Sequence, residues 1–197
     1  MKIQILRVIL GITLTALLSG SVMAAPAGKS VVYVHNLPSL SMVYDASSKL
    51  VRTNRGVSMT IDTNGLYAGA YTVWWIIFNN PHYCENPIPE IGAMCGEPDL
   101  FVDGVYGSAL YATGNVVDED GEGGFGAHLA VGNTDGELIG GPGLLYPRDA
   151  EIHLVVRYHG EVIPMMMPAQ IMTYDGGCGY NSCMDVQDAA HSPYSPW

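Results

Sequence analysis

Short apolar segments separated by turn residues are the feature that most limits the folds open to this chain of 197 residues. Its 24 glycines and 12 prolines are spread along the chain, and the runs between them are rich in Val, Ile, Tyr, Thr and Trp. Such runs are typical of strands joined by turns. No stretch of eleven or more residues shows the 3.6-residue apolar period of an amphipathic helix. The sequence therefore predicts an all-β protein.

About eight strands are predicted, and this number in one domain favours two packed antiparallel sheets, that is, a β-sandwich. A closed β-barrel is the alternative. Leu40–Tyr44 is a weaker strand candidate, and Met184–His191 fits either a last strand or a short helix. The main predicted strands are Ser30–Asn36, Lys49–Thr53, Val57–Asp62, Ala70–Asn79, Ser108–Val117, Phe125–Val131, Glu151–His159 and Gln170–Tyr174.

Two of these strands carry information about their surroundings. Both faces of Ala70–Asn79 are mostly apolar, so this strand should be covered on both sides. Glu151–His159 alternates, with Ile152, Leu154, Val156 and Tyr158 on its apolar face. The opposite face carries His153, Arg157 and His159, and we expect it to be wetter.

The first residues predict export. Lys2 and Arg7 give a positive start, Val8–Leu18 is an apolar stretch, and Val22-Met23-Ala24 places small residues at a cleavage site. This pattern is a secretory signal peptide, too short for a permanent membrane span. The predicted organisation is a signal peptide over 1–24, a single domain over 25–191 and a loose tail over 192–197. The predicted location is periplasmic or extracellular.

Export to an oxidising compartment favours two disulfides among the four cysteines. Three pairings are open, and proximity in the sequence favours Cys84–Cys95 and Cys178–Cys183. A structural zinc site is disfavoured, because neither spacing matches the usual C-x2-C pair.

The charge limits the partners. Without the signal peptide, six basic and nineteen acidic residues remain, a formal net charge of −13. Such a chain repels phosphate backbones, so nucleic acid is excluded as a partner, and anionic membrane surfaces are disfavoured. No second apolar stretch is long enough for a membrane anchor in the mature chain. An unidentified protein or a glycan is the remaining kind of partner.

His128 and His153 are the candidate metal ligands. If Phe125–Val131 and Glu151–His159 pair with Val131 opposite Ala150, the two histidines lie directly opposite each other, with Cβ atoms about 5 Å apart. A third ligand would then complete a copper or zinc site. The alternative is a structural role for both. Met165-Met166-Met167 suits copper as well, but an apolar plug between strands is the more ordinary role for methionines.

Two acidic loops, Asp118–Glu122 and Asn133–Glu137, would gain weight as a calcium site if they met in space. Motifs for catalysis are missing: the sequence has no G-x-S-x-G, no H-E-x-x-H and no phosphate-binding glycine loop with lysine. No residue is therefore assigned a catalytic role. A dispersed serine–histidine–acid trio or a carboxylate pair stays open.

Several segments resemble a family of uncharacterised exported bacterial β-sandwich proteins, for which no activity is established. The resemblance rests on Gly65-Leu66 with Ala70–Trp75, Phe78–Pro81 with Cys84, Glu151–Arg157 with His159-Gly160, and Cys183 with Asp185–Gln187. The Gly-Leu and Tyr-Thr-Val-Trp pattern also resembles immunoglobulin-like sandwiches, which implies a fold and no function.

Three functions follow, in order of preference. The first is an exported, non-catalytic module that binds a protein, a glycan or the cell envelope. The second is a periplasmic metal-handling protein, with copper favoured. The third is a hydrolase with a dispersed site.

Overall fold

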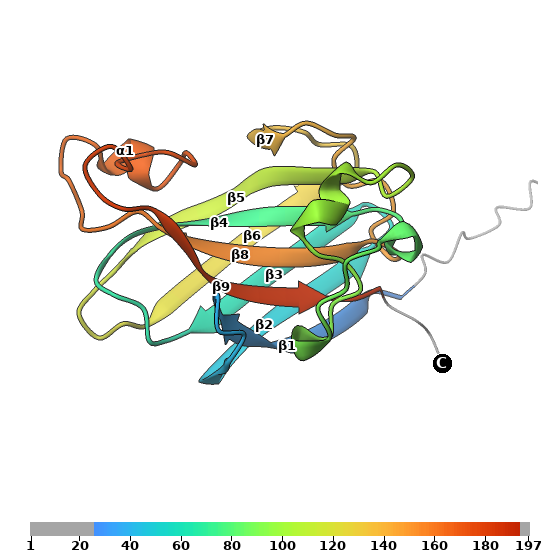
Figure 1. Ribbon diagram of the computed structural model, residues 1–197, viewed down its shortest axis with the longest axis horizontal. Helices are drawn as coiled ribbons and strands as arrows, with labels where there is room; N and C mark the ends of the chain where they lie inside the picture. The colour runs from blue at the N-terminus through green and yellow to red at the C-terminus, as the bar shows by residue number, and fades with distance from the viewer. Residues whose placement is uncertain (1–25, 194–197) are drawn as a thin grey trace, which may run out of the picture.

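The computed structural model describes residues 26–193, and these form an almost entirely β structure (Figure 1). The predicted signal peptide and residues 194–197 of the predicted tail lie outside the described residues. The nine strands of the described part are β1 (Gly28–Asn36), β2 (Met42–Thr53), β3 (Gly56–Thr63), β4 (Gly69–Phe78), β5 (Gly107–Val117), β6 (Gly123–Ala130), β7 (Glu137–Ile139), β8 (Glu151–Tyr158) and β9 (Met184–His191). The short helices are η1 (Pro81–Tyr83), η2 (Pro89–Ile91), η3 (Glu97–Phe101) and α1 (Met167–Gln170).

All described strand pairs are antiparallel and belong to one curled sheet, in the order β6-β3-β2-β1-β9-β8-β4-β5-β7. The prediction of two separate sheets is not confirmed, because β1 and β9 continue the ladder from one side to the other. They do so through two residue pairs, His35 with Asp188 and Asn36 with Gln187. β6 and β7 are the edges of this sheet, so the alternative closed barrel is not found either. We call β6-β3-β2-β1 the first half and β9-β8-β4-β5-β7 the second half.

The inner face of the curled sheet holds the main hydrophobic core. Side chains from both halves meet there, with Leu50 and Ile61 from the first half and Trp75 and Leu154 from the second among the most buried. The predicted apolar face of β8 contributes Ile152, Leu154 and Val156 to this core, as the alternation indicates. Burial of such side chains is the main stabilising contribution to the fold.

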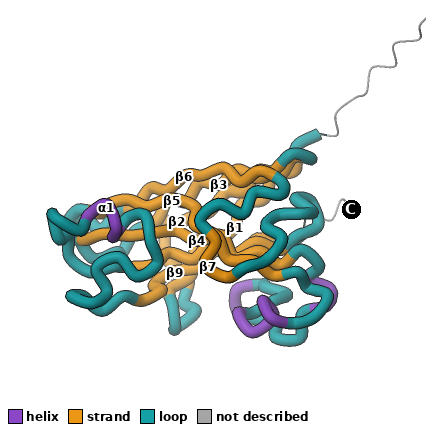
Figure 2. Tube along the Cα trace, turned by 90° about the horizontal axis from the view of Figure 1, so that it is seen from above, coloured by secondary structure: helices purple, strands orange, loops and turns teal. Residues whose placement is uncertain are grey.

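The outer face of the second half is covered by two irregular segments. The first cover (residues 79–106) contains η1, η2, η3 and the disulfide Cys84–Cys95. The second cover (residues 159–183) contains α1 and the disulfide Cys178–Cys183. Figure 2 shows the 3₁₀ helices of the first cover and α1 of the second at opposite ends of the molecule. The prediction that β4 is covered on both sides is confirmed, since nine of its ten residues are buried.

Both covers approach the sheet closely at glycines of β5. A Cβ on Gly107 would collide with the backbone of Leu100 in the first cover, and a Cβ on Gly114 would collide with the backbone of Ile171 in the second. Glycine at these two positions therefore allows backbone to pack directly on backbone.

Some predicted elements differ from those observed. β2 is one continuous strand over the region predicted as two, and β7 is a strand that the pattern did not indicate. Met184–His191 is a strand, which settles that ambiguity. The predicted strand Gln170–Tyr174 is wrong: Gln170 ends α1, and its buried amide bonds the backbone of His159, Glu161 and Ile163. These bonds hold the segment as a turn.

None of the helices in the described part of the chain is long or apolar enough to cross a lipid bilayer.

Candidate functional site

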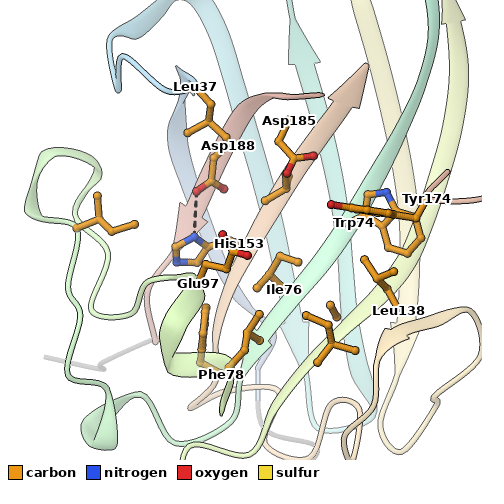
Figure 3. Close-up of a pocket in the computed structure, with 15 residues that line it drawn as sticks. Leu37, Trp74, Ile76, Phe78, Glu97, Leu138, His153, Tyr174, Asp185 and Asp188 are labelled. Atoms are coloured by element: carbon orange, nitrogen blue, oxygen red, sulfur yellow. Dashed lines mark hydrogen bonds and ion pairs between the residues drawn. The ribbon is translucent and has the colours of Figure 1, made fainter. Parts of the chain in front are cut away.

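A pocket of about 220 Å³ lies on the outer face of the second half, between the sheet and its covers (Figure 3). Strands β4, β5, β8 and β9 form its floor, while the two covers, β7 and the β1–β2 turn form its walls. Its volume equals that of about seven water molecules at liquid density. The lining residues are Leu37, Trp74, Ile76, Phe78, Ile88, Glu97, Leu100, Ala109, Leu138, Ile139, His153, Val155, Tyr174, Asp185 and Asp188.

The floor follows from strand alternation and register. Trp74, Ile76 and Phe78 alternate with core residues along β4, so all three point outward. Asp188, Val155 and Trp74 are successive cross-strand partners over β9, β8 and β4. Strands in a sheet are about 4.8 Å apart, so Asp188 and Trp74 are separated by roughly 10 Å across the floor. The pocket thus has one polar end and one aromatic end, which Figure 3 shows on opposite sides.

His153 is the centre of the polar end. Its imidazole is buried and lies between two carboxylates, with Nδ1 3.0 Å from Asp188 Oδ2 and Nε2 3.2 Å from Glu151 Oε1. Burial by itself lowers the pKa of His153, but the two carboxylates outweigh it and raise this pKa to about 10. At neutral pH the ring is therefore a cation that donates from both nitrogens. The predicted wet face of β8 is wrong at this position, because the first cover excludes solvent.

Glu151 joins this polar end to the first cover. Its carboxylate accepts the backbone N–H of Cys95 (2.8 Å) and of Met94 (3.0 Å), next to the disulfide Cys84–Cys95. The hydroxyl of Ser192 donates to it as well, at 3.3 Å. One buried carboxylate therefore binds both the imidazolium of the floor and the backbone of the wall.

A second buried carboxylate fixes the rest of the first cover. Asp99 accepts the backbone N–H groups of Glu85, Asn86 and Gly96. Burial raises the pKa of Asp99, but these hydrogen bonds outweigh it and the pKa is lowered. The wall that carries Leu100 is thus held by a charged, fully bonded anchor.

Asp188 differs from these two carboxylates because half of it is unbonded. Its Oδ2 accepts from His153, while its buried Oδ1 has no hydrogen-bond partner among the described residues. Buried polar atoms are nearly always hydrogen-bonded, and leaving one unbonded costs about 1–3 kcal/mol. His35 lies opposite Asp188 across β1 and β9, and its buried Nδ1 is also without a partner in the described part. Asp188 lines the pocket, and a donor that reached its buried Oδ1 would supply the missing hydrogen bond.

The aromatic end is held by ring contacts and hydrogen bonds. The Trp74 ring meets Tyr174 edge-on at 5.4 Å between centroids, and its Nε1–H donates to Thr72. Arg157 lies 3.8 Å over the Tyr174 ring and donates to Asp185 at 2.8 Å. Because Arg157 is bonded to Asp185 and stacked on Tyr174, the Asp185 carboxylate at the rim is largely neutralised.

The two candidate metal ligands do not share a site. β6, which carries His128, and β8, which carries His153, are separated by β3, β2, β1 and β9 in the sheet. β6 pairs with β3 instead, and exposed His128 bonds Ser58 at 2.9 Å. The predicted pairing of these strands is therefore wrong, because eighteen intervening residues do not fix which strands become neighbours.

Two further expectations, an apolar plug formed by the methionine run and a calcium site formed by the two acidic loops, are also wrong. Met165 is 95% exposed, so the methionine run is not an apolar plug between strands. The two acidic loops lie at opposite ends of β6, about 25 Å apart at the usual rise per residue, and cannot share calcium. Instead, Asp120 and Glu122 line an acidic hollow with Asp45 and Asp62.

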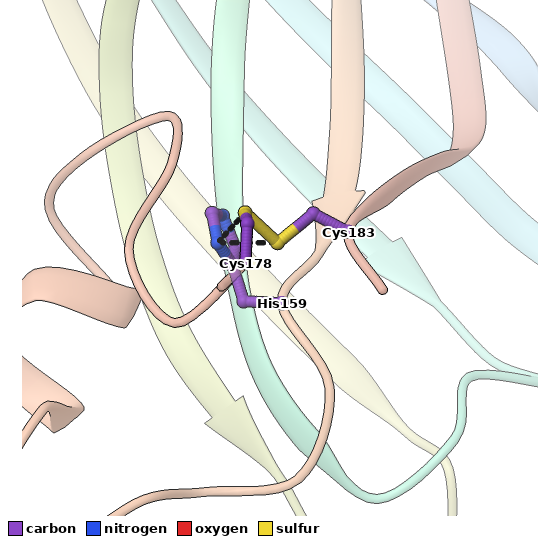
Figure 4. Close-up of side chains that lie close together, drawn as sticks. All are labelled: His159, Cys178 and Cys183. Atoms are coloured by element: carbon purple, nitrogen blue, oxygen red, sulfur yellow. Dashed lines mark hydrogen bonds between the residues drawn. A yellow bond between two sulfur atoms is a disulfide. The ribbon is translucent and has the colours of Figure 1, made fainter. Parts of the chain in front are cut away.

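Both predicted disulfides are confirmed, and each lies within a group of possible metal ligands. Among the described residues these groups are His159 with Cys178 and Cys183, and Asp99 with Cys84 and Cys95. His159 Nδ1 is 3.6 Å from Cys183 Sγ, but it donates to Gly176, and its Nε2 accepts from Thr72 (Figure 4). Burial lowers the pKa of His159, which keeps the ring neutral. With both sulfurs in a disulfide and both nitrogens bonded, this group holds the second cover in place.

Glu151 and Asp188 are the site residues that the sequence pattern did not reveal. Glu151 begins an apolar strand and looked like an ordinary boundary residue, while Asp188 lies within a segment that fitted either a strand or a helix. A buried carboxylate needs a partner. The only signal available was therefore the presence of acids inside apolar strands near a histidine.

Comparisons of the chain with models of protein families, with curated proteins and with solved structures found no match.

Proposed function

We propose that this protein is an exported, non-catalytic binding module that takes a small, partly apolar ligand in the outer-face pocket. The observation that carries the proposal is the pocket itself: a mostly apolar lining with the buried His153–carboxylate group at one end and aromatic rings at the other. This combination is typical of small-molecule sites, in which apolar surface supplies affinity and a few polar groups fix orientation. The proposed location outside the cytoplasm rests on the predicted signal peptide and agrees with the two disulfides.

The chemistry of the pocket supports binding over catalysis. None of the described residues that line it is Ser, Thr, Cys or Lys, so the Tyr174 phenol is the only hydroxyl in this lining and no thiol or amine is present. His153 donates from both ring nitrogens, so it has no lone pair with which to remove a proton near neutral pH. A general base needs such a lone pair within hydrogen-bond reach of its substrate. Of the three lining carboxylates, Asp188 is already bound to His153 and Asp185 to Arg157.

The size of the pocket points to a small ligand. About 220 Å³ is below the roughly 300–1,000 Å³ of sites that bury drug-sized molecules. A single aromatic ring with a short substituent fits this description, since Trp74 and Tyr174 offer ring surfaces at one end. A long glycan or an extended peptide would not be enclosed.

Titration calorimetry of the mature protein with 2-phenylethanol and 2-phenylethylamine tests the proposal. We expect saturable binding of at least one probe. Leu138 stands 40% exposed in the pocket wall, so Leu138→Trp should block the pocket and abolish binding. Val31→Trp is the matched control, because Val31 is exposed on the first half and does not line the pocket. Absence of binding to the unaltered protein, or binding that survives Leu138→Trp, would rule the proposal out.

A further inference from the structure

Three features of the molecule have no role in the proposed function so far: the acidic hollow near β6, the His159–disulfide group, and the unbonded oxygen of Asp188. The acidic hollow is a cluster of carboxylates with no second observation that points to a ligand. The His159–disulfide group is fully bonded. Asp188 Oδ1 is both buried and unbonded within the described structure, and Asp188 is one of the residues that line the pocket.

We propose that the ligand of the outer-face pocket is a small aromatic amine, whose protonated amino group donates to Asp188 Oδ1 while its ring lies against Trp74. This inference rests on the proposed function and names the chemical class of its ligand. Asp188 supplies the acceptor, and Trp74 with Tyr174 supplies the ring surface.

The charges of the polar end favour a cation. Glu151 and Asp188 are two carboxylates and His153 is one imidazolium, so the buried trio carries one net negative charge. Water is kept from this trio, as His153, Glu151 and Asp188 are at most 4% exposed. An incoming ammonium group would neutralise the trio in a region where charges interact strongly.

The other charged side chains of the lining are also negative. Glu97 adds a carboxylate at the rim, and Figure 3 shows it near the polar end. Asp185 is paired with Arg157, so it adds little. Apart from His153, which the two carboxylates hold, no lining residue in the described structure is cationic. An anionic ligand would therefore meet net repulsion, and a neutral one would leave the trio uncompensated.

The two ends are spaced for one small molecule. Asp188 and Trp74 lie two strands apart in the same cross-strand row, roughly 10 Å between backbones, and their side chains both project into the pocket. Val155, between them in this row, supplies an apolar surface for a short aliphatic linker.

Four probes of similar construction test the inference by calorimetry at pH 7: 2-phenylethylamine, 2-phenylethanol, phenylacetate and n-butylamine. We expect 2-phenylethylamine to bind at least tenfold more tightly than 2-phenylethanol, because a hydrogen bond to a charged group is added. Phenylacetate should bind most weakly, and n-butylamine should lose at least tenfold because it lacks the ring.

The variant Asp188→Asn keeps the shape and removes the charge. It should bring 2-phenylethylamine to within about threefold of 2-phenylethanol. Asp62→Asn is the matched control: it removes one carboxylate from the exposed outer surface of the first half and should leave the tenfold preference unchanged. If Asp188→Asn does not fold, a crystal structure of the unaltered protein with 2-phenylethylamine decides, since the amine nitrogen should lie within hydrogen-bond distance of Asp188 Oδ1.

The outcomes separate the inference from the function on which it rests. Failure of all four probes to bind overturns the proposed function. Equal binding of the amine and the alcohol overturns the inference and leaves the function standing. An amine preference that survives Asp188→Asn, an amine placed elsewhere in the crystal structure, or n-butylamine binding as tightly as 2-phenylethylamine also overturns the inference.

Discussion

The outer surfaces of the two halves of the sheet contrast sharply. On the first half, Tyr33 is 64% exposed and Tyr44 is 79% exposed, with no cover over them in the described structure. On the second half, Trp74 is 4% exposed, beneath two disulfide-bonded covers. The inner faces of both halves share one core, and the first cover adds two smaller hydrophobic clusters on the second half. The contrast shows that the covers create an enclosed environment on one half, and this environment holds the candidate site.

The largest expected effect comes from truncating an aromatic residue on each outer surface. Trp74→Ala should reduce the free energy of unfolding by about 3–5 kcal/mol, because it empties a buried volume. Tyr33→Ala should change it by less than about 0.5 kcal/mol, as is usual for exposed positions. Urea unfolding of both variants measures the two values. Equal losses would show that the covers do not pack on the sheet as described.

The next effect concerns buried charge on the covered half. Glu151→Gln should lower the free energy of unfolding by about 3 kcal/mol, because the His153 cation loses one of its two carboxylates. The matched change on the uncovered half, Asp62→Asn, should cost less than about 0.5 kcal/mol. Urea unfolding at pH 7 makes the comparison. A small effect at Glu151 would contradict the view that this carboxylate anchors the first cover.

Removing the disulfides should cost no more than this, and the two losses should rank by loop length. Replacing Cys84 and Cys95 together by Ala should reduce the free energy of unfolding by about 3 kcal/mol, and the same change at Cys178 and Cys183 by about 2 kcal/mol. The cysteines are 11 and 5 residues apart, so the first pair restrains the longer loop in the unfolded chain. Thermal unfolding of the two double variants gives the order, and a reversed order would mean that the second cover depends more on its covalent bond.

A dependence on pH, gradual over several pH units, also distinguishes the two halves. The pKa of His153 rises from 6.5 to about 10 on folding, so its stabilisation is complete below pH 6.5 and is lost as the pH rises towards 10. The slope from this group is at most about 1.4 kcal/mol per pH unit. His153→Gln should flatten the alkaline decline seen in urea unfolding, whereas His128→Gln on the first half should not. An unchanged decline in the His153 variant would contradict this account.

His191 acts in the opposite direction on the inner face and sets the acid limb. Burial, and to a lesser extent Arg52, lowers its pKa from 6.5 to about 3. Its stabilising contribution is present above pH 6.5 and is lost as the pH falls towards 3. Together the two histidines should place maximal stability near pH 6.5.

Local pattern was enough for the features that depend on neighbours in the sequence. The doubly apolar strand around Trp74 indicated burial on both sides, and the alternation from Ile152 to Val156 gave the core face of β8. The short separations of the cysteines gave both disulfides. Each of these predictions needs only a few adjacent residues and, for the disulfides, an oxidising compartment.

Features that depend on distant pairing could not be read in this way. The pairing expected for His128 and His153 assumed that consecutive strands are adjacent, whereas β9, the last strand of the chain, lies between β1 and β8. The site itself requires Asp188 from β9, Glu151 from β8 and the wall at Cys95, which come together only when the sheet closes in this order. No local signal fixes such an order, because the order and register of strands joined by long connections are set by packing in the complete fold.

Glu151 has one consequence that extends beyond its own bonds. The same carboxylate receives the imidazolium beneath the pocket and the main chain of the wall beside it. Loss of this one carboxylate therefore removes a bond from the floor and two from the wall at the same time. The order of the first cover and the ionisation of His153 thus depend on a single side chain.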